Sequence, residues 1–256
     1  MKKIIIYHIC GMIAKLSFLG ELGYLLFQTI SNFPYLFADR KRVMAQLEYI
    51  GVQAIPLVLL IGLFAGTIIA WQGAYQLRNI ASFSLLGGQV CRVIVMEMAP
   101  VLTGLIMSGR VGASMTAEIG AMKVSEQIDA LKIMSIDPIR YIVMPRFFAL
   151  MLMMPVLTLF AMMTAIVGSF VISNFFLEIT AYNFLHSIKT YFYLQDLAGG
   201  LIKSFFFGVI IAWLGCYLGI KTTGGTKGVG ESTIQSFVYA SISILASDFL
   251  LWIVLF

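Results

Sequence analysis

The sequence predicts an all-α integral membrane protein with five transmembrane helices, an N-terminal interfacial helix and a short cytoplasmic helix. Of its 256 residues, 60% are hydrophobic and only 11% are charged, whereas soluble domains are about 45–50% apolar and about 25% charged. The mean hydropathy is +0.96. Five segments also approach the length of about 20 apolar residues that a helix needs to cross a bilayer. A soluble globule and a disordered chain are both excluded.

The first 20 residues have two interpretations. Lys2 and Lys3 precede an apolar run, as in a signal peptide. Lys15 interrupts that run, however, and no small-x-small cleavage site follows it. We therefore expect a retained helix that lies in the membrane interface. It belongs to an N-terminal region at residues 1–48, which precedes the transmembrane region at 49–256 in a single domain.

The five predicted spans differ in the number of charged residues that they contain. Residues 52–71 and 147–177 contain no charge, and the second of these is long enough that it must tilt, break or extend beyond the hydrocarbon layer of about 30 Å. The other three spans, residues 90–110, 197–220 and 232–256, contain ionisable side chains. These are Arg92, Glu97, Lys203 and Asp248.

The Lys and Arg residues predict the orientation. If the N-terminus lies inside, only four of the 17 basic residues fall in the outer half: Arg78, Arg92, Lys189 and Lys203. This bias follows the positive-inside rule. Because the basic residues lie in connecting segments, the net charge of +5 indicates contact with a membrane surface, and no nucleic-acid partner is expected.

The chain has no recognisable catalytic or metal-binding motif. The segment Gly224–Gly230 lacks the order of a phosphate-binding loop, and no G-x-S-x-G motif occurs. Cys10, Cys91 and Cys216 are widely spaced, so they predict neither a disulfide framework nor a zinc site. We therefore expect no enzyme activity, no metal and no cofactor in this chain.

The loop between the second and third spans contains an amphipathic pattern. Ala121, Val124, Ile128 and Leu131 recur with the helical period, and Asp137-Pro138 ends the pattern. Such a helix could lie on lipid headgroups or dock on a soluble protein. The acidic residues favour a protein partner, because membrane-surface helices prefer Lys and Arg. The candidate docking residues are Glu118, Val124, Glu126, Ile128, Asp129 and Leu131.

The same loop resembles a family signature. The run from Glu118 to Leu131, followed by Met134-Ser-Ile-Asp-Pro-Ile-Arg-Tyr141 and Pro145-Arg146, is similar to that of the MlaE permeases, the membrane subunits of ABC transporters that move lipids. Gly109–Ser114, Leu201–Ser204 and Ser247–Phe249 also match, and the resemblance covers residues 45–256.

The resemblance implies a homodimer of five-span subunits, with a fold like that of ABCG- and ABCA-type permeases. A separate ATPase, which binds ATP and Mg, would dock on a coupling helix at about residues 118–136. A small accessory protein on the ATPase is possible. Phospholipid would bind in a cavity at the dimer interface and pass to or from an MCE-domain protein, maintaining envelope lipid asymmetry. The expected location is the bacterial inner membrane, with the plastid inner envelope as the alternative.

Small residues recur at intervals of four in two spans. Gly104, Ser108 and Gly112 lie in the second span, and Gly62 and Gly66 lie in the first. This spacing allows two helices to approach closely. The contact lies either within one subunit or across a dimer.

The ionisable residues inside the spans are the last candidates. A charge at the centre of the bilayer costs about 2.5–3.5 kcal/mol, so it faces protein or water. Glu97 precedes Pro100 in Met96-Glu-Met-Ala-Pro, where the family commonly reads Arg-Glu-Leu-x-Pro, which makes Lys203 the candidate partner of Glu97. We expect Glu97 and Lys203 to line a polar cavity for lipid headgroups, or to form a structural ion pair. Asp248 is expected to be structural or interfacial.

The sequence is also compatible with two alternatives to a lipid transporter permease. An ion- or proton-coupled carrier or channel would use Arg92, Glu97, Lys203 and Asp248 as a relay. A structural anchor would only hold other subunits together.

Overall fold

The computed structural model describes residues 20–32, 34, 39–77 and 85–255, and within these ranges it contains helices and no strand. Five helical segments are long and apolar enough to cross a membrane, as the sequence predicts. The interfacial helix expected at residues 1–20 lies almost wholly outside the described residues, which begin with a helix at residues 20–31.

The first and third spans are longer than the charge-free segments at residues 52–71 and 147–177. In chain order the elements are α2 (Arg40–Ile50), η2 (Val52–Ala54), α3 (Ile55–Leu77), α4 (Leu86–Val93), η4 (Ile94–Met98), α5 (Ala99–Met107), η5 (Ser108–Gly112), α6 (Ala113–Val124), α7 (Gln127–Ile133), η6 (Ile139–Val143), α8 (Met144–Phe175), α9 (Ala181–Tyr191), α10 (Leu194–Lys221) and α11 (Gly225–Leu255). The second span, from α4 to α6, contains two π-helical turns, η4 and η5.

The third span is one continuous helix. α8 runs for 32 residues through Pro155 without a break, so its length is about 48 Å. That length exceeds the hydrocarbon layer. Of the three predicted outcomes, a break inside the helix is therefore excluded, whereas a tilt and an extension beyond the hydrocarbon layer both accommodate this length.

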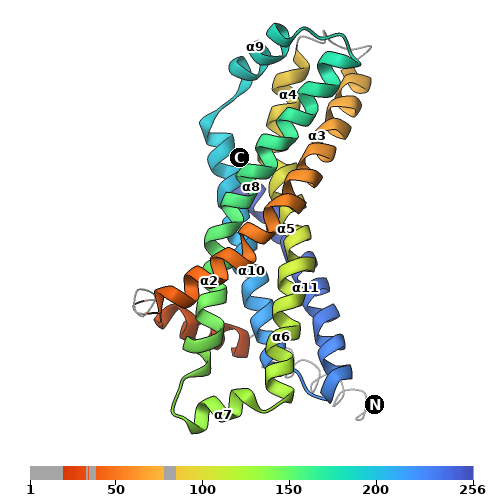
Figure 1. The fold of residues 1–256 in the computed structure, drawn as a ribbon. Helices are drawn as coiled ribbons and strands as arrows, with labels where there is room; N and C mark the ends of the chain where they lie inside the picture. Colours follow the sequence, from red (N-terminus) through yellow and green to blue (C-terminus); the bar gives the residue numbers. More distant parts are fainter. Residues whose placement is uncertain (1–19, 33, 35–38, 78–84, 256) are drawn as a thin grey trace, which may run out of the picture.

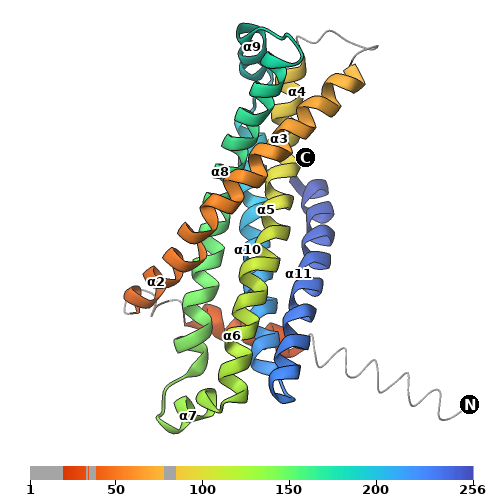
Figure 2. The same cartoon turned by 45° about the vertical axis from the view of Figure 1, so that its right-hand side comes forward.

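The helices form a narrow, elongated bundle in which α10 packs against α5, α6, α8 and α11. α3 crosses α8, and Figure 2 shows α2 and α3 as one slanted rod. At this crossing a Cβ atom on Gly66 would lie 1.9 Å from the carbonyl oxygen of Ala165. Only glycine permits that approach, so the small residues of the first span serve packing within the chain.

The small residues of the second span also make contacts within the chain. The Oγ atoms of Ser108 and Ser241 on α11 are 3.3 Å apart. A Cβ atom on Gly104 would lie 3.1 Å from Phe207 Cδ2, and one on Gly112 would lie 2.9 Å from Ile211 Cγ2, both on α10. These contacts lie within one chain, and a contact of the same residues across a dimer stays a prediction.

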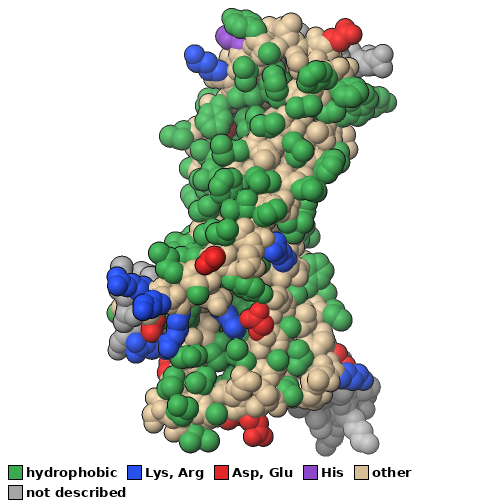
Figure 3. All heavy atoms as spheres, in the orientation of Figure 1, with side chains coloured by type: hydrophobic (Ala, Val, Ile, Leu, Met, Phe, Trp, Pro, Cys, Tyr) green, Lys and Arg blue, Asp and Glu red, His purple; other side chains and the backbone are tan. Residues whose placement is uncertain are grey.

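The two ends of the bundle differ in character. α7 lies at one end and α9 at the other (Figure 1). Figure 3 shows Lys and Arg side chains gathered toward the α7 end, around α2, while hydrophobic side chains cover most of the surface above them. This distribution agrees with the predicted orientation, in which the α7 end is cytoplasmic.

Candidate functional site

Three ionisable residues from separate elements meet inside the bundle. Lys203 on α10 is fully buried, and its Nζ lies 2.5 Å from Glu97 Oε1 on η4 and 3.0 Å from Asp248 Oδ1 on α11. The same ammonium group lies 5.1 Å from the centre of the Trp252 ring. We call Glu97, Lys203 and Asp248 the ionic cluster. Pairing is what makes a buried charge tolerable in this environment.

The local backbone explains how the ionic cluster forms. One turn before Lys203, a Cβ atom on Gly200 would lie 2.2 Å from the carbonyl oxygen of Val95, so α10 approaches η4 closely there. η4 is a π-helical turn, which offsets Glu97 from the regular helical register. Such turns are frequent at functional sites.

The ionic cluster presents carboxylates, and not its lysine, to the surroundings. The side chain of Glu97 is 32% exposed and that of Asp248 is 18% exposed, whereas that of Lys203 is 0% exposed. Glu97 and Lys203 form an ion pair, and two carboxylates and Trp252 enclose Lys203. The role of the pair in a lipid cavity stays a prediction. With two carboxylates and one ammonium, the accessible groups are hydrogen-bond acceptors.

Arg92 does not join the ionic cluster. Its Nε donates to Asp196 Oδ2 at 2.8 Å, and its guanidinium lies 5.4 Å from the centre of the Tyr193 ring. Asp196 was not among the predicted site residues, although it lies seven residues before Lys203 and therefore on the same face of α10. The four-residue relay considered above is thus divided into two separate ion-paired groups.

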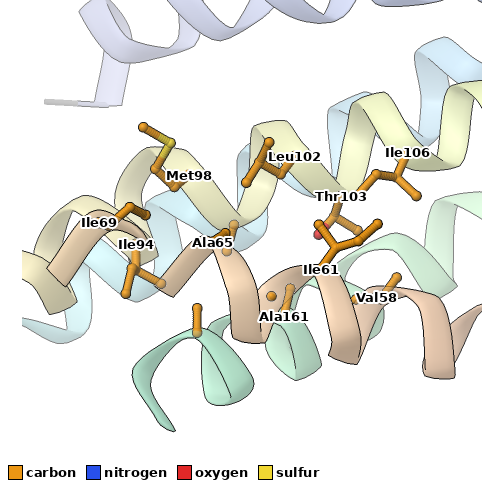
Figure 4. A pocket seen from close by; sticks show the side chains of 13 residues that line it. Val58, Ile61, Ala65, Ile69, Ile94, Met98, Leu102, Thr103, Ile106 and Ala161 are labelled. Carbon is orange, nitrogen blue, oxygen red and sulfur yellow. The ribbon is translucent and has the colours of Figure 1, made fainter. Parts of the chain in front are cut away.

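A narrow apolar crevice lies between α3, α5 and α8. Figure 4 shows Ile61, Ala65 and Leu102 among the side chains that line it, and Thr103 is its one hydroxyl-bearing residue. Its volume is about 10 Å³, which is room for a single water molecule at most. This crevice is too small for a lipid.

The predicted coupling helix at about residues 118–136 is two helices in the structure. α6 ends at Val124 and α7 begins at Gln127, because Glu126 adopts a left-handed conformation with φ 59°. Asp129 holds the two helices together: it accepts hydrogen bonds from Lys123 at 2.9 Å and from Lys132 at 3.0 Å. Both bonds lower the pKa of the Asp129 carboxyl below its ordinary value.

The turn changes which side chains the loop exposes. Ile128 is only 2% exposed, so its expected direct contact with a partner is corrected to a role in the interior. Leu131 is half-buried, whereas Val124 is 39% exposed. Ile133 and Met134 are 86% and 68% exposed. These two residues were not among the predicted docking residues, although they are an adjacent apolar pair just before Asp137-Pro138.

The acidic docking candidates also differ from one another. Glu118 accepts a hydrogen bond from Arg146 Nη2 at 3.0 Å and one from the Tyr49 hydroxyl at 3.3 Å. It therefore joins α6 to α8 and α2. Glu126 is exposed at the turn, and Asp129 makes the intramolecular bonds described above.

Comparison with known proteins identifies the class of this bundle. Residues 43–254 match the family described as Permease MlaE. The chain belongs to the MlaE permease family. It is 38% identical to a probable ABC transporter permease protein of Synechocystis sp., over 83% of this chain and 81% of the relative. It is also 31% identical to the intermembrane phospholipid transport system permease protein MlaE of Haemophilus influenzae, over 93% and 92%.

A plant relative extends the family beyond bacteria. The chain is 33% identical to the protein TRIGALACTOSYLDIACYLGLYCEROL 1, chloroplastic, of Arabidopsis thaliana, over 82% of this chain and 60% of the relative. The matched region covers nearly all of the five candidate spans in the described part of the chain, together with the ionic cluster and α7. The chain is thus a multi-pass membrane permease, and the resemblance seen in its central loop is confirmed.

Proposed function

We propose that this MlaE permease is the membrane subunit of an ABC transporter that moves phospholipid between the membrane and an MCE-domain partner, and so maintains envelope lipid asymmetry. The observation that carries the proposal is the family match over residues 43–254. The name of the Haemophilus influenzae relative, a phospholipid transport permease, supports the substrate class.

The proposed assembly contains two copies of this chain and a cytoplasmic ABC ATPase, with a small accessory protein on the ATPase. The ATPase binds ATP and Mg, because the permease sequence contains no phosphate-binding loop. The membrane is the bacterial inner membrane, with the plastid inner envelope as the alternative in view of the chloroplast relative.

The proposed ATPase docking surface consists of Val124, Ile133 and Met134. These residues are exposed beside α7, at the end of the molecule that the basic residues mark as cytoplasmic. Because Asp129 holds α7 on α6 and Arg146 joins α6 to α8, movement of a docked ATPase passes to two spans at once.

The proposed lipid contact in the membrane is Glu97. It is the most exposed member of the ionic cluster, so it accepts hydrogen bonds from an amine or hydroxyl of a headgroup. Lys203 contributes by holding Glu97 in place. The apolar crevice of Figure 4 is too narrow for acyl chains. In the proposed dimer, the lipid lies between the two copies of the chain.

The test is phospholipid transfer by the reconstituted complex. Proteoliposomes containing the permease and its ATPase should release a fluorescent phospholipid to a purified MCE-domain protein only when ATP is present. Glu97→Gln should slow this transfer while the complex stays assembled. Transfer that persists without the ATPase but stops without an ion gradient would replace the proposal with a coupled carrier.

A further inference from the structure

A second cavity lies at the α7 end, away from the ionic cluster. It has a volume of about 460 Å³ and lies between α2, α6, α7 and the start of α8. This volume is within the range of about 300–1,000 Å³ that small-molecule sites occupy. Its polar lining consists of Arg42, Gln46, Gln127, Tyr141 and Arg146, and among the described residues that line it none is acidic. We call it the arginine cavity.

Arg146 gives the arginine cavity a buried positive charge. Its side chain is 9% exposed, and its Nη2 donates to Glu118. Its Nη1 is buried and has no hydrogen-bond partner in the described structure. A guanidinium carries five donors and cannot lose its proton in a protein. The single carboxylate bound to Arg146 therefore leaves hydrogen-bonding capacity unused, and a buried donor without a partner is unfavourable.

Arg42 adds a second guanidinium in a fixed orientation. It lies over the ring of Tyr141, 4.0 Å from the ring centre, and its Nη1 is 3.2 Å from Asp39 Oδ1. Gln46 and Gln127 bring side-chain amides from α2 and α7. One stacked arginine and one buried arginine, supplemented by amide donors, suit a phosphate group, which has several acceptor oxygens.

The surroundings place this cavity at the depth of lipid headgroups. α2 begins with Arg40-Lys41-Arg42 and exposes Met44, which is 66% accessible, and the η2 turn that follows begins with Val52, which is 55% accessible. A helix that changes from basic to apolar in this way passes from the cytoplasmic headgroup layer into the hydrocarbon. The cytoplasmic surface of bacterial and organellar membranes carries anionic lipids, so the charge of the cavity is complementary to its neighbours.

We propose that the arginine cavity binds the phosphate headgroup of an anionic phospholipid from the cytoplasmic leaflet. Arg42 and Arg146 are the charged partners, and Gln46 and Gln127 are the amide donors. Because these residues come from α2, α7 and α8, the bound headgroup joins the helix that receives the ATPase to the first and third spans. This site is distinct from the ionic cluster and does not depend on the direction or the cargo of transport.

The test is direct binding to the full-length permease purified in a neutral detergent. A fluorescent short-chain phosphatidylglycerol should bind saturably, and the matching phosphatidylcholine should bind more weakly. Arg42→Gln should raise the dissociation constant about tenfold, as expected for a lost charge-assisted hydrogen bond. The matched control is Lys227→Gln, which removes the same charge from a side chain that is 89% exposed and outside the cavity.

A second variant and a competitor complete the test. Gln127→Leu removes a donor from an exposed residue of α7, so it should weaken phosphatidylglycerol binding without affecting the elution of the folded protein on size exclusion. Equal affinity of Arg42→Gln and Lys227→Gln would overturn the proposal. Displacement of the lipid probe by excess inorganic phosphate would also overturn it, because the site would then belong to a soluble anion. The assay contains no ATPase, so its outcome is separate from that of the transport assay.

Discussion

At the scale of single residues, Lys203 is the buried cation that pairs with two carboxylates inside the transmembrane bundle. Its two carboxylate partners, Glu97 and Asp248, come from different spans, and no solvent reaches it. The sequence predicted that Glu97 and Lys203 lie together, because an uncompensated charge in a span needs a partner. It could not predict that Asp248 completes the group, because the helical period of α11 does not specify which face meets α10.

The ionic cluster should be sensitive to removal of its single cation. Lys203→Met leaves two carboxylates without a counter-charge, which should destabilise the fold by about 3–5 kcal/mol. The measurement is thermal unfolding of the detergent-purified protein. Adding Glu97→Gln and Asp248→Asn to Lys203→Met should recover part of the loss, whereas Lys189→Met on exposed α9 should have little effect. A Lys203→Met protein with unchanged thermal stability would contradict the assigned ion pairs.

Asp129 should make the contact between α6 and α7 dependent on pH. Hydrogen bonds from Lys123 and Lys132 lower its pKa below the ordinary value of 3.8. The contact is therefore fully present above that value and is lost as the pH falls through the lower pKa of the folded state. Hydrogen exchange of the α7 amides, corrected for the intrinsic rate, should show this loss. Asp129→Asn should remove the pH dependence, and a wild-type profile that stays flat in acid would contradict it.

At the scale of elements, the sequence predicted the five spans well and the loop less well. Long apolar segments leave a helix as the only way to satisfy the backbone in lipid, so the spans follow from composition. The helical spacing of Ala121, Val124, Ile128 and Leu131 continues across the turn at Glu126, which hides the break. After the turn, α7 runs in a new direction. The spacing therefore identified Ile128 as an apolar position of the helix. It did not show that this side chain faces the interior.

The turn at Glu126 leaves Ile128 buried and Ile133 exposed, so the two isoleucines of α7 have different roles. Ile133→Asp places a charge on an exposed surface and should abolish co-purification of the ATPase without lowering the yield of the permease. Ile128→Asp buries a charge and should lower the yield itself. Ala130→Ser, an exposed change on the same helix, is the control for ATPase binding. Normal ATPase recovery with Ile133→Asp would exclude this surface as the docking site.

At the scale of the whole molecule, the bundle has a basic end with α7 and an opposite end with α9 (Figures 1 and 3). Lys and Arg placement in the sequence was sufficient to predict this polarity, because the bias depends on loops and not on tertiary packing. The sequence could not predict how the spans pair. That pairing depends on backbone approaches such as the one between Gly66 and Ala165.

The orientation can be checked with single cysteines. Met134→Cys beside α7 and Leu185→Cys on α9 are both exposed, while the natural Cys91 and Cys216 are buried. In a Cys10→Ser background, a maleimide that cannot cross membranes should label Leu185→Cys in intact cells. It should label Met134→Cys only after the cells are permeabilised. The reverse pattern would invert the predicted topology.

The unbroken α8 has a geometric consequence. One helix of 32 residues begins beside the loop that carries α7 and ends shortly before α9, so it works as a lever with arms of about 24 Å on either side of its midpoint. A tilt of only about 5° would displace each end by about 2 Å in opposite directions. Helix shifts of about 1–2 Å are typical of conformational switching at interfaces. A small rotation of α8 about its midpoint would therefore move the α7 end and the α9 end of the bundle at the same time.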